Sequence, residues 1–303
     1  MKRQIRPRLR KRKRQKTEKD HKDHKNFKVY KPMYLLCTKG ILLFRLNGKL
    51  VTVFGEYHRS KKEWDRIYQQ NDCIDLVKSG VTTSPSEYIY NMGENKGVIL
   101  ELSPDDNILF KSCYNINKVY ETCKNYNIYA QKIDIRNAIF RREIQDISYW
   151  GSIVNHKNNT YYHVTYQQLI NMFNEVTLFY NFYHKIPELS AYVIHFMNML
   201  KKVENIILKS QEKQKNKDKY ISKDILNSIR KDFIDIQASV LDINILNSIY
   251  TIDPRINNIV IVCGYAHLVR VFDFFKNYKS NTEFICCKTA KNDVCQIINL
   301  KNC

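Results

Sequence analysis

The chain has 303 residues, of which 44% are hydrophobic and 12% aromatic, so it is long and apolar enough to bury a sizeable core. Its formal net charge is +20, but residues 1–31 hold 15 Lys and Arg against three acidic residues, so most of the excess lies in this short segment. No apolar run reaches the roughly 18–20 residues that a membrane span needs, so we expect none.

The basic block at residues 2–16 is too highly charged to collapse into a core, and we expect residues 1–31 to form a disordered tail. The block lacks the apolar centre of a secretory signal. Dense Lys and Arg suit an import receptor or loose contact with nucleic acid, although a purely solubilising extension has the same composition. We therefore expect an intracellular protein, nuclear or cytoplasmic.

The bias toward Lys, Ile, Asn and Tyr is typical of an AT-rich genome, such as that of a large DNA virus or a parasite. A viral protein would then reside in the host cell.

The nine cysteines include no Cys-x-x-Cys pair, which argues against a zinc ribbon or a thioredoxin-like motif. With no secretory signal, reduced thiols are the expectation.

Residues 32–303 are expected to form one domain. A short strand at about 33–38 precedes two apolar runs, 41–46 and 49–54, which flank Asn47-Gly48 and so predict a hairpin. The second run continues into Gly55-Glu56-Tyr57-His58. Residues 59–97 are polar and broken by glycine and proline, including Pro85, which predicts a short helix near 64–70 followed by an exposed excursion.

A strand at 98–102, a helix at about 115–126 and a strand at 128–135 come next, and this order predicts a parallel βαβ unit. The first of these strands carries Glu101. The second delivers Asp134 and Arg136, which would share one face if both stay in strand geometry.

The pattern from about residue 138 to 250 is helical, most clearly at 189–208, with a charged break at 211–219. His195 and the Tyr/Phe stripe at 173–183 are predicted to be core. A strand at 259–263 ends in Gly264-Tyr265-Ala266-His267, and a helix at 268–277 and a strand at 284–287 follow. The sequence thus predicts an α/β fold with a mixed, mostly parallel sheet and a helical insertion at about 138–250.

Two distant segments, 51–58 and 259–267, share one pattern: an apolar strand, a glycine, and a histidine three residues later. In open parallel sheets the chemistry lies just beyond the carboxyl ends of the strands. We therefore expect the polar side chains at four strand ends to converge. They are Glu56 and His58, then Glu101, then Asp134 and Arg136, and finally His267.

A carboxylate near a histidine either orients it as a base or joins it as a metal ligand. Such ligands suit zinc, manganese or iron with an open position that activates water. The candidate metal ligands are His58, His267, Glu56, Glu101 and Asp134. Structural alternatives remain: each histidine as a hydrogen-bonded strand cap, and Asp134 with Arg136 as an ion pair.

In their order and strand contexts, Gly55-Glu56-Tyr57-His58, Glu101 and Gly264-Tyr265-Ala266-His267 resemble the TraB/Tiki, erythromycin-esterase and ChaN-like superfamily. The resemblance covers residues 48–136 and 257–287. It implies metal-dependent peptidase activity, opening of a lactone by a Glu/His set, or haem binding, because one fold hosts several functions. Asp134 and Arg136 have no firm counterpart in the superfamily, and Tyr57 and Tyr265 replace residues that are often small.

The expected function is hydrolysis, metal-assisted, of a peptide or small-molecule substrate. Glu56 would be the base or a ligand, His58 and His267 ligands or proton-transfer groups, and Glu101 a ligand or an orienting acid. Arg136 would stabilise negative charge that develops during the reaction. The alternatives are a haem- or ligand-binding protein with Tyr or His on iron, and an inactive nuclear protein that acts through its basic tail.

Overall fold

The computed structural model describes residues 34–35, 38–69, 82–104, 113–140, 164–213, 221–279, 281–290 and 298–300. Contacts divide the chain into two units, Met1–Lys31 and Pro32–Cys303. The predicted basic tail lies outside the described residues, and so does most of the predicted charged break. The fold described below is that of the second unit.

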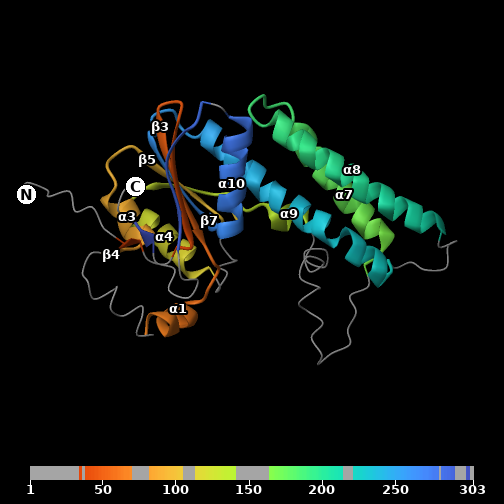
Figure 1. Ribbon diagram of the computed structural model, residues 1–303, viewed down its shortest axis with the longest axis horizontal. Helices are drawn as coiled ribbons and strands as arrows, with labels where there is room; N and C mark the ends of the chain where they lie inside the picture. The colour runs from red at the N-terminus through yellow and green to blue at the C-terminus, as the bar shows by residue number, and fades with distance from the viewer. Residues whose placement is uncertain are drawn as a thin grey trace, which may run out of the picture. The chain divides into compact units, whose positions relative to one another are not determined.

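A six-stranded sheet in the order β6-β5-β7-β3-β2-β8 forms the centre of the domain (Figure 1). Its strands are β2 (Gly40–Leu46), β3 (Lys49–Glu56), β5 (Lys96–Leu100), β6 (Tyr129–Lys132), β7 (Asn258–Gly264) and β8 (Glu283–Thr289). Strands β6, β5, β7 and β3 run parallel, whereas β2 pairs antiparallel with β3 and β8. The predicted mixed, mostly parallel sheet is confirmed.

The β2–β3 connection is the tight hairpin that Asn47-Gly48 predicts. Asn47 has φ 50° and Gly48 has φ 79°, and Leu46 pairs directly with Lys49. Two consecutive positive φ values match the twist of the flanking strands, which explains why Asn and Gly occupy these positions.

A separate small sheet joins β4 (Thr82–Thr83), β1 (Tyr34–Leu35) and β9 (Ile298–Asn299).

Helix α1 (Lys61–Tyr68) is the short helix predicted near 64–70, whereas α3 (Pro85–Asn91) lies in the region expected to be an exposed excursion. Each begins with a capping box, formed by Ser60 with Glu63 and by Ser84 with Glu87. Pro85 was expected to break structure but starts α3 instead. The first helical position needs no N–H donor, and the fixed φ of proline suits it.

Helices cover both faces of the sheet (Figure 1). On one face α3 and α4 (Tyr114–Asn125) pack on Val98, Leu100, Val260 and Val262. On the other, α9 (Lys223–Thr251) and α10 (Tyr265–Tyr278) pack on Ile99, Ile259 and Ile261. Alternate residues of β5 and β7 therefore serve opposite faces, as the period of a strand requires.

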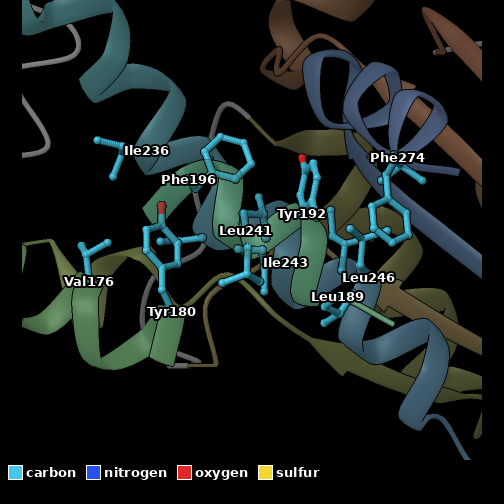
Figure 2. Close-up of a cluster of buried hydrophobic side chains, with 14 of the residues drawn as sticks. Val176, Tyr180, Leu189, Tyr192, Phe196, Ile236, Leu241, Ile243, Leu246 and Phe274 are labelled. Atoms are coloured by element: carbon cyan, nitrogen blue, oxygen red, sulfur yellow. The ribbon is translucent and has the colours of Figure 1, made fainter. Parts of the chain in front are cut away.

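Helices α7 (Tyr166–Tyr183) and α8 (Ser190–Lys213) pack with α9 to form the helical region, whose core is shown in Figure 2. Tyr180 is fully buried there, and its hydroxyl is 2.6 Å from the Ser239 hydroxyl. Three details differ from expectation. Helix α8 continues past residue 211 to Lys213, and His195 is exposed rather than packed in the core. Phe182, part of the Tyr/Phe stripe predicted to be core, is 64% exposed.

Among the described cysteines, Cys113, Cys123, Cys263 and Cys287 are free, whereas Cys286 takes part in a disulfide bond. The expectation of reduced thiols is therefore wrong for Cys286.

No helix in the described ranges is both long and apolar enough to cross a membrane.

Candidate functional site

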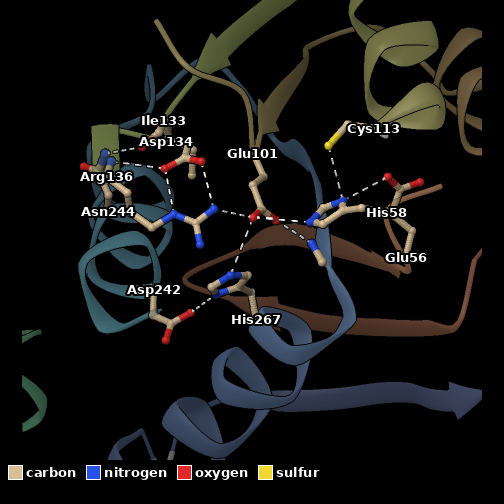
Figure 3. Close-up of polar contacts among 11 residues, drawn as sticks. Glu56, His58, Glu101, Cys113, Ile133, Asp134, Arg136, Asp242, Asn244 and His267 are labelled. Atoms are coloured by element: carbon tan, nitrogen blue, oxygen red, sulfur yellow. Dashed lines mark hydrogen bonds and ion pairs between the residues drawn. The ribbon is translucent and has the colours of Figure 1, made fainter. Parts of the chain in front are cut away.

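The parallel order β6-β5-β7-β3 brings the predicted polar residues together at one edge of the sheet (Figure 3). Glu56 ends β3 and pairs in register with Gly264 at the end of β7. Glu101 directly follows β5, whose last residue Leu100 pairs with Val262 of β7. His267 is the third residue of α10. The predicted convergence of the four strand ends is thus present in the structure.

Asp134 and Arg136 reach the site in a different way from the one expected. Strand β6 ends at Lys132, and Arg136 is the first residue of the short helix α5 (Arg136–Ile139). The two residues therefore do not share a strand face. Instead Arg136 turns back on Asp134: its backbone N–H and Nε donate to Oδ1 at 3.1 and 2.8 Å, and Nη2 donates to Oδ2 at 2.8 Å.

In both strand-Gly-His motifs, the glycine stands where a side chain would come too close to neighbouring atoms. A Cβ at position 55 would lie 2.9 Å from the Cβ of Leu268 and 3.0 Å from the Cα of Tyr265, so Gly55 lets α10 approach β3. A Cβ at position 264 would lie 3.1 Å from Nε2 of His58 and 3.4 Å from Oε2 of Glu101. Gly264 therefore keeps the space in which the site residues meet.

Glu101 is the centre of the cluster. Its Oε2 accepts the backbone N–H of Gly264 at 2.5 Å, and its Oε1 accepts Nη2 of Arg136 at 2.7 Å. Nε2 of His58 and Nε2 of His267 each lie 3.6 Å from the same Oε1. Burial raises the pKa of Glu101, but the neighbouring His267, His58 and Arg136 outweigh burial and hold it well below its ordinary value.

His267 is oriented by Asp242, which the sequence analysis missed. Oδ1 of Asp242 lies 2.5 Å from Nδ1 of His267, and both residues are buried. A carboxylate only accepts, so Nδ1 carries the proton and Nε2 faces Glu101. Asp242 lies on α9 between Leu241 and Ile243, both fully buried. Asp242 is the one charged residue in the stretch 236–250 of α9, and this was the available signal, because an unpaired buried carboxylate is costly.

The helical region also holds the loop that carries Asp134. Nδ2 of Asn244 donates to the carbonyl of Ile133 at 2.7 Å, and the hydroxyl of Tyr183 donates to Oδ1 of Asn244 at 3.0 Å. The predicted insertion thus supplies Asp242 to the site and Asn244 to its supporting loop.

His58 lies at the accessible side of the cluster, with 36% of its side chain exposed. Its Nδ1 is 3.5 Å from Sγ of Cys113 and 3.6 Å from Oε1 of Glu56. Burial lowers the pKa of His58, but hydrogen bonds with Cys113, Glu101 and Glu56 outweigh burial and raise it above its ordinary value. The imidazolium form is therefore favoured.

Glu56 contrasts with Glu101. The residue is 3% exposed, yet neither carboxylate oxygen has a hydrogen-bond partner among the described residues. Burial raises the pKa of Glu56, although His58 and Asn115 partly oppose this. Glu56 thus has the His58 ring as its ion-pair partner at 3.6 Å but lacks the N–H hydrogen bonds that Arg136 and Gly264 give to Glu101.

Several of the predicted metal ligands already have other partners in this structure. Within the described ranges, no group of three or more His, Cys, Asp or Glu side chains has the arrangement of a metal centre. Both oxygens of Glu101 already accept N–H groups, and the Arg136 guanidinium beside Oε1 would repel a divalent cation. Asp134 is held by Arg136, and Glu56 lies at the opposite nitrogen of His58 from Glu101.

Comparisons with protein-family models, curated proteins and solved structures give no match. The site is therefore interpreted from its own geometry.

Proposed function

We propose that this chain is a hydrolase that cleaves an ester or amide bond with water, using the paired histidines at the carboxyl edge of its sheet. The observation that carries the proposal is the position of the two imidazoles. Nε2 of His58 and Nε2 of His267 face one oxygen of Glu101, which also accepts from Arg136. Two proton-transfer groups beside a buried cation form a set that serves acyl transfer to water.

His267 is the proposed general base. Asp242 accepts a hydrogen bond from Nδ1, so proton uptake and release take place at Nε2, where the neutral ring removes a proton from water. The residue is buried and its ring is held by contacts on both nitrogens, so the base is preorganised.

His58 is the proposed general acid, because its raised pKa favours the protonated form that a leaving group needs. Its partial exposure lets a substrate reach it. Arg136 supplies positive charge where the tetrahedral intermediate becomes negative, and Asp134 and Glu101 hold the guanidinium in place.

The test is a hydrolysis assay of the full chain on p-nitrophenyl esters, lactones and chromogenic peptides. For the substrates that the wild type cleaves, we expect His267→Ala to lower kcat/KM by about 10²–10⁴-fold, the usual contribution of a general base. His195→Ala is the matched control, since His195 is exposed on α8 away from the site, and should leave kcat/KM unchanged. An inactive wild type, or a fully active His267→Ala variant, would overturn the proposal.

Elemental analysis of the same preparation tests whether the side chains act without a metal ion. We expect no stoichiometric zinc, manganese or iron, because the Arg136 guanidinium already neutralises Glu101 and Asp134 and would repel a divalent cation. A metal present at about one per chain and lost in the His58→Ala/His267→Ala double variant would replace this mechanism with a metal-assisted one. Iron with a Soret band would indicate haem instead.

A further inference from the structure

Cys113 stands beside the proposed general acid and has no role in the mechanism above. It is a free thiol, 7% exposed, at the N-cap position of the 12-residue helix α4. Its Sγ lies 3.5 Å from Nδ1 of His58 (Figure 3). The contact joins segments 55 residues apart in the sequence, so it exists only in the folded chain.

The His58 ring connects this thiol to the carboxylate at the centre of the site. Nδ1 faces Sγ of Cys113, and Nε2 on the other side of the ring faces Oε1 of Glu101 at 3.6 Å. A nucleophile, a histidine and a carboxylate joined in this order are the signature of an activated nucleophile. Thiolates are further favoured beside an imidazolium and at a helix N-terminus.

A second feature marks this side of His58 as a place for a ligand. Glu56 approaches Nδ1 to 3.6 Å and is 3% exposed, and neither of its oxygens has a hydrogen-bond partner among the described residues. Buried polar groups in folded proteins are almost always hydrogen-bonded. The missing donor at Glu56 is one that a bound substrate would supply, next to the thiol.

We propose that Cys113 is the catalytic nucleophile of this site and that it forms a thioester with acyl substrates. Sγ attacks as the thiolate of an ion pair with the His58 imidazolium. As Sγ bonds to the acyl carbon, the bond from that carbon to the alcohol or amine breaks, and His58 gives its proton to this leaving group. Water next attacks the thioester, with its proton taken by His267. The C–S bond breaks, the carboxylic acid and the thiolate are released, and the proton on His267 passes through solvent to His58, which restores the ion pair. The scheme rests on the hydrolase proposed above for this second step.

Two of the other described free thiols, Cys123 and Cys287, provide internal controls. Cys123 lies on the same helix and is 1% exposed, and burial raises its pKa to about 11. Cys287 is exposed on β8, and desolvation raises its pKa as well. Neither has the His58 contact of Cys113. Accessibility alone would make Cys287 the most reactive of the three.

The first test is alkylation of the full chain at pH 7 with limiting iodoacetamide, followed by peptide mapping. We expect Cys113 to react at least about tenfold faster than both Cys123 and Cys287, because its sulfur lies 3.5 Å from the His58 ring and an adjacent imidazolium activates a thiol. His58→Gln should remove this advantage at Cys113 and leave Cys287 unchanged. A Cys113 that reacts no faster than Cys123 would overturn the proposal.

The second test is acyl trapping with p-nitrophenyl acetate and mass spectrometry of the quenched protein. We expect an acetyl group on Cys113 in the wild type, none in Cys113→Ala, and an unchanged yield in Cys287→Ser. If wild type hydrolyses esters and Cys113→Ala does so equally fast, the nucleophile assignment fails while the hydrolase stands. If Cys113 is acetylated but the acetyl group is never released, the hydrolase fails while the nucleophile stands.

Discussion

The chain makes one hydrogen-bonding pattern twice, at Asp134–Arg136 and at Asp253–Arg255. In both, the arginine donates from its backbone N–H and Nε to Oδ1 of the aspartate and from Nη2 to Oδ2. The side chains of Asp134 and Arg136 are 9% and 27% exposed, whereas those of Asp253 and Arg255 are 32% and 88% exposed. The buried pair also touches an anion, Glu101, whereas the exposed pair lies beside a cation, Lys49, whose ammonium donates to the Asp253 carbonyl.

The difference shows what the local motif does and what its surroundings add. An arginine two residues after an aspartate forms the pair in either setting. An exposed pair of this kind contributes little to stability, because water and salt screen it. Beside Glu101, the same pair neutralises buried carboxylates, and there the loss of one partner leaves an uncompensated charge. Burial at the strand ends, rather than the motif, makes Arg136 part of the site.

The sharpest test of this comparison removes the cation from each pair. Arg136→Met should lower the free energy of unfolding by about 3–5 kcal/mol, because Glu101 and Asp134 remain buried without their partner. Arg255→Met is the matched control and should leave the urea denaturation midpoint unchanged. Equal losses in the two variants would show that the local pair, and not its burial, carries the stabilisation.

The acid dependence of stability sharpens the same comparison. In the folded protein the pKa of Glu101 lies below its ordinary value, and a hydrogen bond from Arg255 lowers that of Asp253 to about 2. A lowered carboxyl pKa gives stability that is present above the unfolded pKa, about 4, and lost as the pH falls toward the folded pKa.

Urea unfolding between pH 5 and pH 2 measures this loss. We expect Glu101→Gln to flatten the dependence clearly, because the carboxylate whose protonation drives it is gone. Asp253→Asn should follow the wild-type slope closely, since its pair is screened by water. If the stability of Glu101→Gln falls with pH as steeply as that of the wild type, the buried cluster does not lower the pKa of Glu101.

Glu56 extends the comparison to a buried carboxylate that has no arginine partner. We expect its substitution to change the stability least. Burial raises the pKa of Glu56, so its neutral form adds stability that is lost as the pH rises through the folded pKa. Glu56→Gln should therefore have a higher Tm than the wild type at pH 8, and the difference should shrink toward pH 4. A lower Tm at pH 8 would show that the ionised Glu56 is stabilised by His58.

Much of the fold and four of the site residues follow from patterns along the chain. Asn47-Gly48 predicts the hairpin, and the strand-Gly-His segments place Glu56, His58 and His267 beyond strand ends. Because parallel strands present their carboxyl ends at one edge, Glu101 joins them without any knowledge of side-chain contacts. Periodicity and backbone propensity are local, so the sequence determines them directly.

Tertiary structure alone decided how these residues are used. Asp242 and Cys113 reach the histidines from α9 and from the start of α4, and no periodic pattern encodes contacts between such distant segments. The end of β6 at Lys132 turns Arg136 back on Asp134 and toward Glu101. The sequence also contains a second Asp-x-Arg pair, Asp253 and Arg255, that has no place in the site. Whether a carboxylate accepts hydrogen bonds, like Glu101, or has none among the described residues, like Glu56, depends on burial and distance, which only the folded chain sets.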